Sequence, residues 1–314
     1  MIFKKKNIIN FIFIFTNFTL VLFTLFLLLK PEKFPIQVFK NSIYSKTTLY
    51  NYINLKTDID KKRNDEPVIK SCNKKYCQSA SYINLPPDEF VFGYISVFNN
   101  IFKIKSKKND ILLLGNATGS NLAGILHFIE QKKLQNIKID VVEIDKEYTT
   151  VGEKYFNLQK NDKRVKYFYE DARTFLNRNN DQYDIIYFDI YTESFVFPNY
   201  LITTEAIQHI ANALNENGIL VMNIIGSAKY GTNPNLYMNQ IYTQIKHEIP
   251  YVKIIIPNDS KPNAIRNNYV LIASKSQNEP EIIKNKLTNK EYKKMKLTSE
   301  IYTDKYSPIE KFSL

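Results

Sequence analysis

The sequence predicts an α/β protein built on a doubly wound, mostly parallel sheet of seven strands. Short runs of continuous apolar residues recur between positions 110 and 276, and such runs are typical of strands that are buried on both faces. Amphipathic stretches of helical length lie between most of these runs, which favours helices on both faces of the sheet. With 44% hydrophobic and 14% aromatic residues among 314, the composition excludes a disordered chain.

Residues 1–30 are predicted to be a basic flank and a transmembrane anchor. Lys4–Lys6 precede an uncharged apolar run, Asn7–Leu29, which at about 1.5 Å per residue can cross a hydrocarbon layer of about 30 Å. Lys30–Glu32 follow in place of the small residues of a cleavage site, so an uncleaved single-pass membrane helix is expected. Lys4–Lys6 favour a cytoplasmic N-terminus, but lysines beyond the run nearly balance them, so the side of the soluble domain is undetermined.

Residues 31–104 are predicted to form a small β-rich element, a β-hairpin type of structure, followed by a linking helix. Cys72 and Cys77 flank a four-residue polar turn. They fit either a hairpin disulfide or two free thiols, and their spacing does not support a metal site. The stretch "PPDEFVFGYISVFNNIFKI", residues 86–104, begins with proline and acidic residues, a pattern that predicts a helix start.

Residues 105–276 are predicted to form the main domain, followed by a charged tail, 277–314, that is helical at its start. The two last strand candidates are close in sequence and predict an antiparallel hairpin at the end of the sheet. The strand candidates are 111–115, 139–145, 165–171, 183–191, 218–225, 251–257 and 268–274, and helices are expected at 119–132, 147–157 and 203–214.

Polar residues follow four successive strands of the predicted sheet. Ligands of doubly wound sheets bind at the carboxyl ends of the strands. Gly115, Asn116 and Gly119 follow the first strand, where Gly115 permits a sharp turn and Gly119 permits close approach of the backbone to a ligand. A tight turn without a ligand has the same pattern, so this signal is weak by itself.

The acids that follow the next three strands strengthen the prediction of a nucleoside site. Glu143 lies 28 positions after Gly115, and a carboxylate at about this distance can accept the hydrogens of ribose hydroxyls. Asp171 and the adjacent Ala172 follow the third strand, where they can contact an adenine amino group. Asp189 follows the fourth. Each acid alone also fits a structural role at a strand end, whereas four in succession favour one shared site.

The stretch 110–225 resembles the catalytic domain of spermidine synthase-like proteins, relatives of the class I S-adenosylmethionine-dependent methyltransferases. The similarity covers roughly residues 70–310 and implies a Rossmann-like, methyltransferase-type fold. The matching segments are "LLLGNATG", "VVEIDKE", "EDARTFL", "YDIIYFDIY", "LITTEAIQHI", "NGILVMNI" and, outside that stretch, "QSASYINLPPDEFVFGYI" and "TDKYSPIE".

The resemblance implies roles for the residues at the strand ends. It assigns Asp189 as the catalytic aspartate, and it implies decarboxylated S-adenosylmethionine or S-adenosylmethionine as a substrate, with no metal. The residues implied in binding the adenosyl compound are Gly115 and Gly119 near its amino-acid end, Glu143 at the ribose, and Asp171 and Ala172 at the adenine. Asn116 and Ile144 are also assigned to this binding site.

Several positions depart from the family pattern on the side of the amine acceptor. Thr118 and Thr192 occupy positions where the family has acids, and Phe92–Tyr94 replace a Tyr-His-Glu segment. Tyr191 and Glu193 are predicted to bind the substrate and to compensate in part. A pocket for a multiply charged amine should be acidic, so binding of the adenosyl compound is more firmly predicted than synthesis of spermidine.

The expected function is therefore a membrane-anchored transferase that moves an aminopropyl group from decarboxylated S-adenosylmethionine to a polyamine. An S-adenosylmethionine-dependent methyltransferase of unknown acceptor and a non-catalytic module that binds a nucleoside or a partner remain alternatives. The expected partners are a small-molecule amine or other acceptor and the membrane, and a homodimer is left open. The net charge of +12 comes from scattered lysines, so no nucleic-acid partner is expected.

Overall fold

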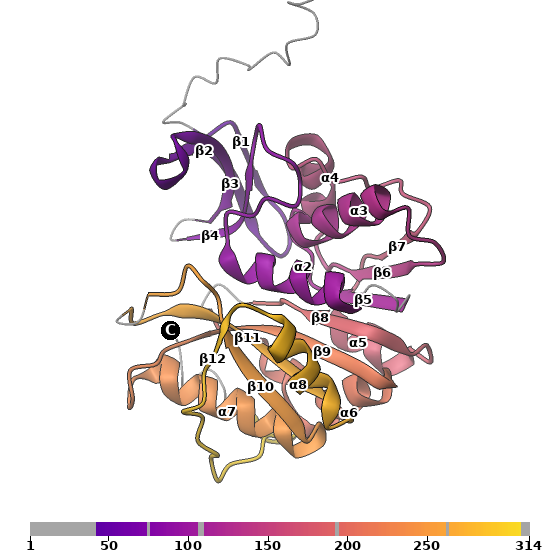
Figure 1. The fold of residues 1–314 in the computed structure, drawn as a ribbon, viewed down its shortest axis with the longest axis vertical. Helices are drawn as coiled ribbons and strands as arrows, with labels where there is room; N and C mark the ends of the chain where they lie inside the picture. Colours follow the sequence, from indigo (N-terminus) through magenta and orange to yellow (C-terminus); the bar gives the residue numbers. More distant parts are fainter. Residues whose placement is uncertain (1–41, 74–75, 106–109, 192–194, 262–263, 309–314) are drawn as a thin grey trace, which may run out of the picture. The chain divides into compact units, whose positions relative to one another are not determined.

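The computed structural model describes residues 42–73, 76–105, 110–191, 195–261 and 264–308. All of these residues belong to one compact unit, Phe39–Leu314. Within the described ranges, the chain forms a four-stranded antiparallel sheet and an eight-stranded, mostly parallel sheet (Figure 1).

The four-stranded sheet confirms the predicted small antiparallel element. Its strands follow one another in sequence order. Ile53 and Leu55 are fully buried and pack against Tyr148 and Phe156, in and just after α4 of the main domain. The sheet is therefore held by the main domain on one face. Its strands are β1 (Tyr44–Thr47), β2 (Tyr52–Asp60), β3 (Glu66–Cys72) and β4 (Cys77–Tyr82), with the short helix η1 (Lys61–Arg63) after β2.

The large sheet has the order β12-β10-β11-β9-β8-β5-β6-β7. From β5 the chain winds outward through β6 and β7, then returns to place β8 and β9 on the other side, all parallel. The order of the strands therefore reverses between β5 and β8, where a doubly wound sheet opens a crevice. The strands are β5 (Asp110–Leu114), β6 (Lys138–Val142), β7 (Val165–Phe168), β8 (Tyr183–Phe188), β9 (Leu214–Gly226), β10 (Tyr251–Ile256), β11 (Asn267–Ser274) and β12 (Lys290–Glu291).

The seven predicted strands of this sheet are confirmed, and β12 adds a short eighth. β11 runs antiparallel to both β9 and β10, which confirms the predicted antiparallel pair at the end of the sheet. Most strand candidates extended one to three residues beyond the observed strands at their carboxyl ends. Those extra residues, Glu143 and Asp189 among them, belong to the loops that carry the candidate site.

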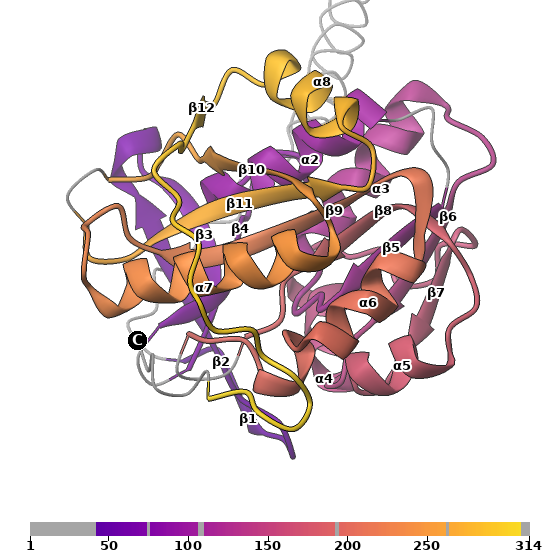
Figure 2. The ribbon, with the colours of Figure 1, turned by 90° about the horizontal axis from the view of Figure 1, so that it is seen from below.

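Helices cover both faces of the large sheet, as Figure 2 shows. Phe98 of α2 and Ile283 of α8 belong to the core on one face, together with α3. Phe175 of α5 and Tyr237 of α7 belong to the core on the other, together with α6. The helices are α2 (Gly93–Lys105), α3 (Ser120–Lys132), α4 (Lys146–Tyr155), α5 (Ala172–Arg178), α6 (Thr204–Asn212), α7 (Asn233–Glu248) and α8 (Asn278–Lys286), with the short helix η2 (Asn199–Leu201).

Helix α2 begins later than the sequence predicts. The proline and acidic residues at 86–89 form a turn, in which the Glu89 N–H donates to the Pro86 carbonyl. The helix starts at Gly93, whose N–H donates to Asp259 Oδ2 at 2.9 Å. The cap of α2 therefore comes from a residue 166 positions away, so local sequence patterns could not show where the helix begins.

The segment 295–306, near the end of the described chain, is held to the main domain by hydrogen bonds and an ion pair. Tyr302 is fully buried, and its backbone N–H and carbonyl both bond the side-chain amide of Gln244. Arg173 Nη2 lies 2.7 Å from Asp304 Oδ2. Two sequence segments that carried the family resemblance, "EDARTFL" and "TDKYSPIE", are thus bonded to each other.

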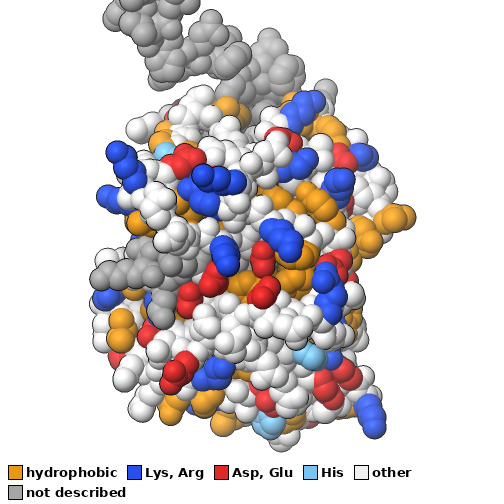
Figure 3. All heavy atoms as spheres, turned by 90° about the vertical axis from the view of Figure 1, so that its right-hand side faces the viewer, with side chains coloured by type: hydrophobic (Ala, Val, Ile, Leu, Met, Phe, Trp, Pro, Cys, Tyr) orange, Lys and Arg blue, Asp and Glu red, His pale blue; other side chains and the backbone are white. Residues whose placement is uncertain are grey.

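The predicted membrane anchor, residues 7–29, lies outside the described residues. Within the part of the chain that the structure describes, no helix combines the length and the apolar character that a membrane crossing requires. This finding corrects the prediction of a single-pass membrane location. On the face drawn in Figure 3, positive and negative side chains are interspersed.

Candidate functional site

A cavity of about 390 Å³ opens at the carboxyl ends of β5, β6, β7, β8 and β9. Residues of the small sheet, the first turns of α2 and the segment 195–201 contribute further parts of its lining. Glu193 lies outside the described residues, and Gly119 is not part of the lining. The eight other predicted site residues all line this one cavity: Gly115, Asn116, Glu143, Ile144, Asp171, Ala172, Asp189 and Tyr191.

The turn after β5 requires glycine at Gly115. Its φ of +81° is left-handed, and a Cβ at this position would lie 2.4 Å from the Asp189 carbonyl oxygen. Gly119 also has a left-handed φ, +84°, but a Cβ there would meet the Leu158 side chain at 2.7 Å. Gly119 is therefore needed for the turn and for packing, and its close approach to a ligand stays a prediction.

Between these glycines, Asn116 presents unsatisfied polar atoms. Within the described part of the chain, neither its side-chain oxygen nor its side-chain nitrogen has a hydrogen-bond partner, although both are buried. Buried polar atoms of this kind are rare in folded proteins and call for an explanation. Because Asn116 lines the cavity, a polar ligand such as a nucleoside with an amino-acid-derived chain fits this position.

Glu143 holds the glycine turn in place. Its Oε2 accepts the N–H groups of Asn116 and Ala117 at 3.0 and 2.9 Å, and its Oε1 accepts the Asp145 N–H at 2.9 Å. Ala117 has a left-handed φ of +44°, which costs energy for a residue with a Cβ. Burial raises the pKa of Glu143, and the three backbone bonds partly oppose that rise. Its contact with a ribose stays a prediction.

Asp171 caps α5 and accepts a hydrogen bond from a tyrosine hydroxyl that also lines the cavity. Its Oδ1 accepts the Thr174 N–H at 3.0 Å, and its Oδ2 accepts the Tyr200 hydroxyl at 2.9 Å. Burial and this bond raise the pKa of Tyr200 to about 12. The cap fixes the start of α5 and so places Ala172 in the cavity wall.

Asp189 follows β8, with one neutral donor on each carboxylate oxygen. Asn223 Nδ2 donates to Oδ1 and the Tyr94 hydroxyl donates to Oδ2, both at 3.0 Å. Burial raises the pKa of Asp189 to about 6, while the bonds from Asn223 and Tyr94 lower it. A carboxylate with this pKa is ionised at neutral pH, yet basic enough to take a proton from a reacting group.

The sequence prediction missed the two partners of Asp189. Asn223 lies on β9, inside the apolar run "GILVMNII", and a polar residue near the carboxyl end of a buried strand was the signal that could have found it. Tyr94 is in the first turn of α2, whose start the sequence misplaced. The predicted substrate residue Tyr191 donates to the Asn223 carbonyl at 2.7 Å and accepts the Ile225 N–H at 2.9 Å. It therefore also fixes β9 beside Asp189.

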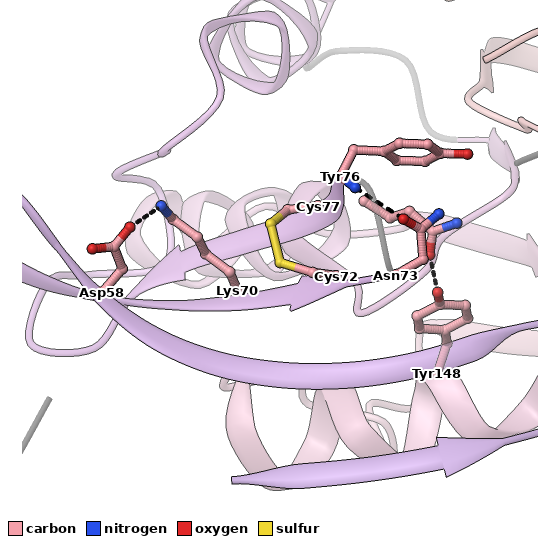
Figure 4. Close-up of a disulfide and its surroundings, with 8 residues drawn as sticks. Asp58, Lys70, Cys72, Asn73, Tyr76, Cys77 and Tyr148 are labelled. Atoms are coloured by element: carbon pink, nitrogen blue, oxygen red, sulfur yellow. Dashed lines mark hydrogen bonds and ion pairs between the residues drawn. A yellow bond between two sulfur atoms is a disulfide. The ribbon is translucent and has the colours of Figure 1, made fainter. Parts of the chain in front are cut away.

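The β3–β4 hairpin forms one wall of the cavity, and a disulfide closes its end. Cys72 and Cys77 are bonded, which decides between the two states left open by the sequence. Cys77 and its neighbours Tyr76 and Gln78 line the cavity, and Gln78 accepts the Tyr148 hydroxyl. Figure 4 shows the disulfide between the two strands, with the Tyr76 ring directed away from it.

Comparison with known protein families and curated sequences points to one family. The model of the spermine/spermidine synthase domain matches residues 100–279. The polyamine aminopropyltransferase of Clostridium beijerinckii is 30% identical over 170 residues, 53% of this chain and 57% of that protein. The polyamine aminopropyltransferase of Clostridium botulinum is 31% identical over 137 residues, 43% of this chain and 46% of that protein. The chain thus spans about half the length of these curated relatives.

Solved structures show the same fold. A probable spermidine synthase from Corynebacterium glutamicum superimposes with a TM-score of 0.60 at 16% identity, covering 87% of this chain and 93% of the other. Spermidine synthase from Thermotoga maritima gives a TM-score of 0.56 at 16% identity, covering 85% and 82%. At this identity the likeness establishes the fold alone, the α/β fold of these spermidine synthase structures. Among the described residues, no cluster of His, Cys, Asp or Glu side chains is suited to hold a metal ion.

Proposed function

Because the chain belongs to the spermine/spermidine synthase domain family, we propose that it is an aminopropyltransferase. It transfers the aminopropyl group of decarboxylated S-adenosylmethionine to a primary amine. The observation that carries the proposal is Asp189, a carboxylate with a pKa of about 6 in the cavity that also contains the glycine turn. The resemblance implies a polyamine acceptor, and the proposal requires only a primary amine.

The turn after β5 and the ends of β6 and β7 would hold the adenosyl compound. Asn116 offers buried donors and acceptors without partners in the described structure. Ile144, Asp171 and Ala172 line the same cavity. The sulfonium of the bound compound would make the adjacent methylene carbon electrophilic.

Asp189 would act as the base for the attacking amine. The amine nitrogen forms a bond to the methylene carbon, and the carbon–sulfur bond breaks with its electron pair left on sulfur. The products are the alkylated amine and neutral methylthioadenosine. The proton lost by the amine passes to Asp189, while Tyr94 and Asn223 hold its two oxygens in place.

The test measures methylthioadenosine release from decarboxylated S-adenosylmethionine in the presence of primary amines. Asp189→Asn should lose at least about a hundredfold of turnover, in the range of general base catalysis, while its affinity for methylthioadenosine changes little. Asp181→Asn, just before the opposite end of the same strand β8, is the matched control and should retain turnover. Full turnover of Asp189→Asn would exclude Asp189 as the base.

A further inference from the structure

Two turns from distant parts of the chain contribute to the cavity wall. The turn between β1 and β2, residues 48–51, contributes Tyr50 and Asn51, and the glycine turn after β5 contributes residues 115–117. The backbone N–H groups of such turns need partners outside the regular bonds of sheets and helices. In both turns these partners are side chains, and the two sets of bonds meet at Asp145.

The Thr48 hydroxyl fixes the turn between β1 and β2. Its Oγ1 accepts the N–H groups of Tyr50 and Asn51 at 3.1 and 2.9 Å, and it donates to Asp145 Oδ2 at 2.6 Å. A hydroxyl has one donor and two acceptor sites, so these three bonds use its full capacity. Asn51 Nδ2 donates to the same carboxylate oxygen at 3.0 Å. The turn is therefore bonded twice to Asp145.

Asp145 is also bonded to the residue that fixes the glycine turn. Its backbone N–H donates to Glu143 Oε1 at 2.9 Å, and Glu143 Oε2 accepts the N–H groups of Asn116 and Ala117. The other carboxylate oxygen of Asp145, Oδ1, accepts the Glu147 N–H at 3.1 Å and so caps α4. A continuous hydrogen-bond network therefore joins the two turns, and Asp145 lies at its middle.

Asp145 and Thr48 lie behind the cavity wall. Asp145 is 3% exposed, and neither residue is part of the lining. The hairpin is also held to α4 by other contacts, because Tyr44 and Lys46 of β1 both bond Glu147. Figures 1 and 2 show β1 and β2 beside α4. Loss of the Thr48 bond should therefore free the turn and leave the small sheet in place.

We propose that Asp145 is a positioning residue for the adenosyl compound and sets both turns in the arrangement that binds the nucleoside. This inference rests on the proposed transferase function and deepens it. If the turns took up this arrangement only about a tenth of the time, the apparent Kd would rise about tenfold. The Asp189 carboxylate bonds Tyr94 and Asn223, outside this network, so its contribution to the reaction should not change.

Two substitutions of Thr48 in the full chain test the network. Thr48→Val keeps the shape of the side chain and removes the hydroxyl, so the Kd for methylthioadenosine in calorimetry should rise about tenfold. Thr48→Ser keeps the hydroxyl and should bind as the unaltered chain does. Ser45→Ala, in the same hairpin, removes a bond to the Tyr52 hydroxyl and should also leave the Kd unchanged. Equal affinity of the Thr48→Val and Thr48→Ser variants would overturn the inference.

Asp145→Asn tests the middle of the network. An amide accepts on one side only, so it cannot accept both the Glu147 N–H and the Thr48 hydroxyl, and the Kd should again rise about tenfold. The double variant with Thr48→Val should bind no more weakly than Asp145→Asn alone, because losses within one network are not additive. Losses that add would show that the two residues act independently and would contradict the inference.

Kinetics separate positioning from a general loss of structure. In Thr48→Val, the KM for decarboxylated S-adenosylmethionine should rise about tenfold, while kcat and the KM for the amine stay unchanged. A fall in kcat at an unchanged KM for the adenosyl compound would contradict a positioning role in its binding.

Amide hydrogen exchange separates failure of this inference from failure of the proposed function, because it needs no ligand. In Asp145→Asn, the N–H groups of residues 50–51 and 116–117 should exchange faster than in the unaltered chain, since the network holds both turns. If both turns respond but no amine supports turnover, the transferase proposal is wrong and the positioning role stands. If turnover occurs and either turn exchanges at its original rate, the transferase proposal stands and the positioning role is wrong.

Discussion

At the scale of single residues, two buried carboxylates in one cavity have different environments. Glu143 accepts three backbone N–H groups, which fix it as part of the glycine turn. Asp189 accepts one side-chain donor on each oxygen, so each oxygen keeps capacity for a further bond. This difference favours Asp189 as the group that exchanges a proton and Glu143 as the group that holds the backbone.

The pKa of Asp189 predicts the pH dependence of activity. A base must be ionised, so kcat/KM should fall as the pH drops below about 6, the pKa that burial gives this carboxyl group. Because the Asn223 hydrogen bond lowers that pKa, Asn223→Leu should move the acidic limb to higher pH. The measurement is a pH profile of methylthioadenosine release.

Asn215→Leu is the control for this profile. Asn215 lies on the same strand β9 and donates to Asp184 Oδ1 at 2.9 Å, at the other end of the strand. Its substitution removes a similar bond away from the cavity and should leave the limb in place. An unchanged limb in Asn223→Leu would contradict the assignment of the limb to Asp189.

At the scale of elements, α2 depends on a cap from a distant loop. Asp259 accepts the Gly93 N–H at the first position of the helix, and Tyr94 follows at once. Asp259→Ala should lower the free energy of unfolding by about 1 kcal/mol, as for other lost caps, and reduce turnover because the Tyr94 hydroxyl loses its fixed position. Urea unfolding and the release assay measure the two effects.

Asp259→Asn is the matched variant, because its side-chain oxygen can still accept the Gly93 N–H. It should retain most of the stability and turnover. If the alanine and asparagine variants lose stability and turnover equally, the contribution of Asp259 comes from its charge and not from the hydrogen bond that caps α2.

The β3–β4 hairpin gives a second prediction for an element. Reduction of the disulfide between Cys72 and Cys77 should lower the free energy of unfolding by up to about 2 kcal/mol, the chain-entropy value for a loop this short. It should also weaken methylthioadenosine binding, because Cys77 and the adjacent Tyr76 line the cavity. Calorimetry with and without a dithiol reductant measures this change.

The double variant Cys72→Ser/Cys77→Ser should bind as weakly as the reduced protein and should not respond to the reductant. A response in that variant would assign the effect to something other than this disulfide.

At the scale of the whole molecule, the sequence predicted the sheet and eight of the residues that line the cavity for a physical reason. Continuous apolar runs identify buried strands, and polar residues just beyond them identify the edge where ligands bind. The contact of Asp259 with Gly93 could not be predicted in this way. The two residues are 166 positions apart, and local sequence patterns do not reveal such contacts.

Tyr302 allows a test of how far the late segment 295–306 supports the fold. Its side chain is fully buried in the core that also contains α5, α6 and α7. Tyr302→Ala should lower the free energy of unfolding by about 3–5 kcal/mol, as for other large-to-small core changes. Tyr306→Ala, at a side chain that is 56% exposed, should have little effect in the same thermal or urea unfolding experiment.

The bond between Arg173 and Asp304 also sets an order of events during synthesis. The two residues are 131 positions apart, and α5, which carries Arg173, places Ala172 in the cavity wall. At about 5–20 residues per second, a ribosome needs roughly 7–26 s to travel from one to the other. A nascent chain can therefore form the strands that carry the cavity well before Asp304 is available to bond Arg173.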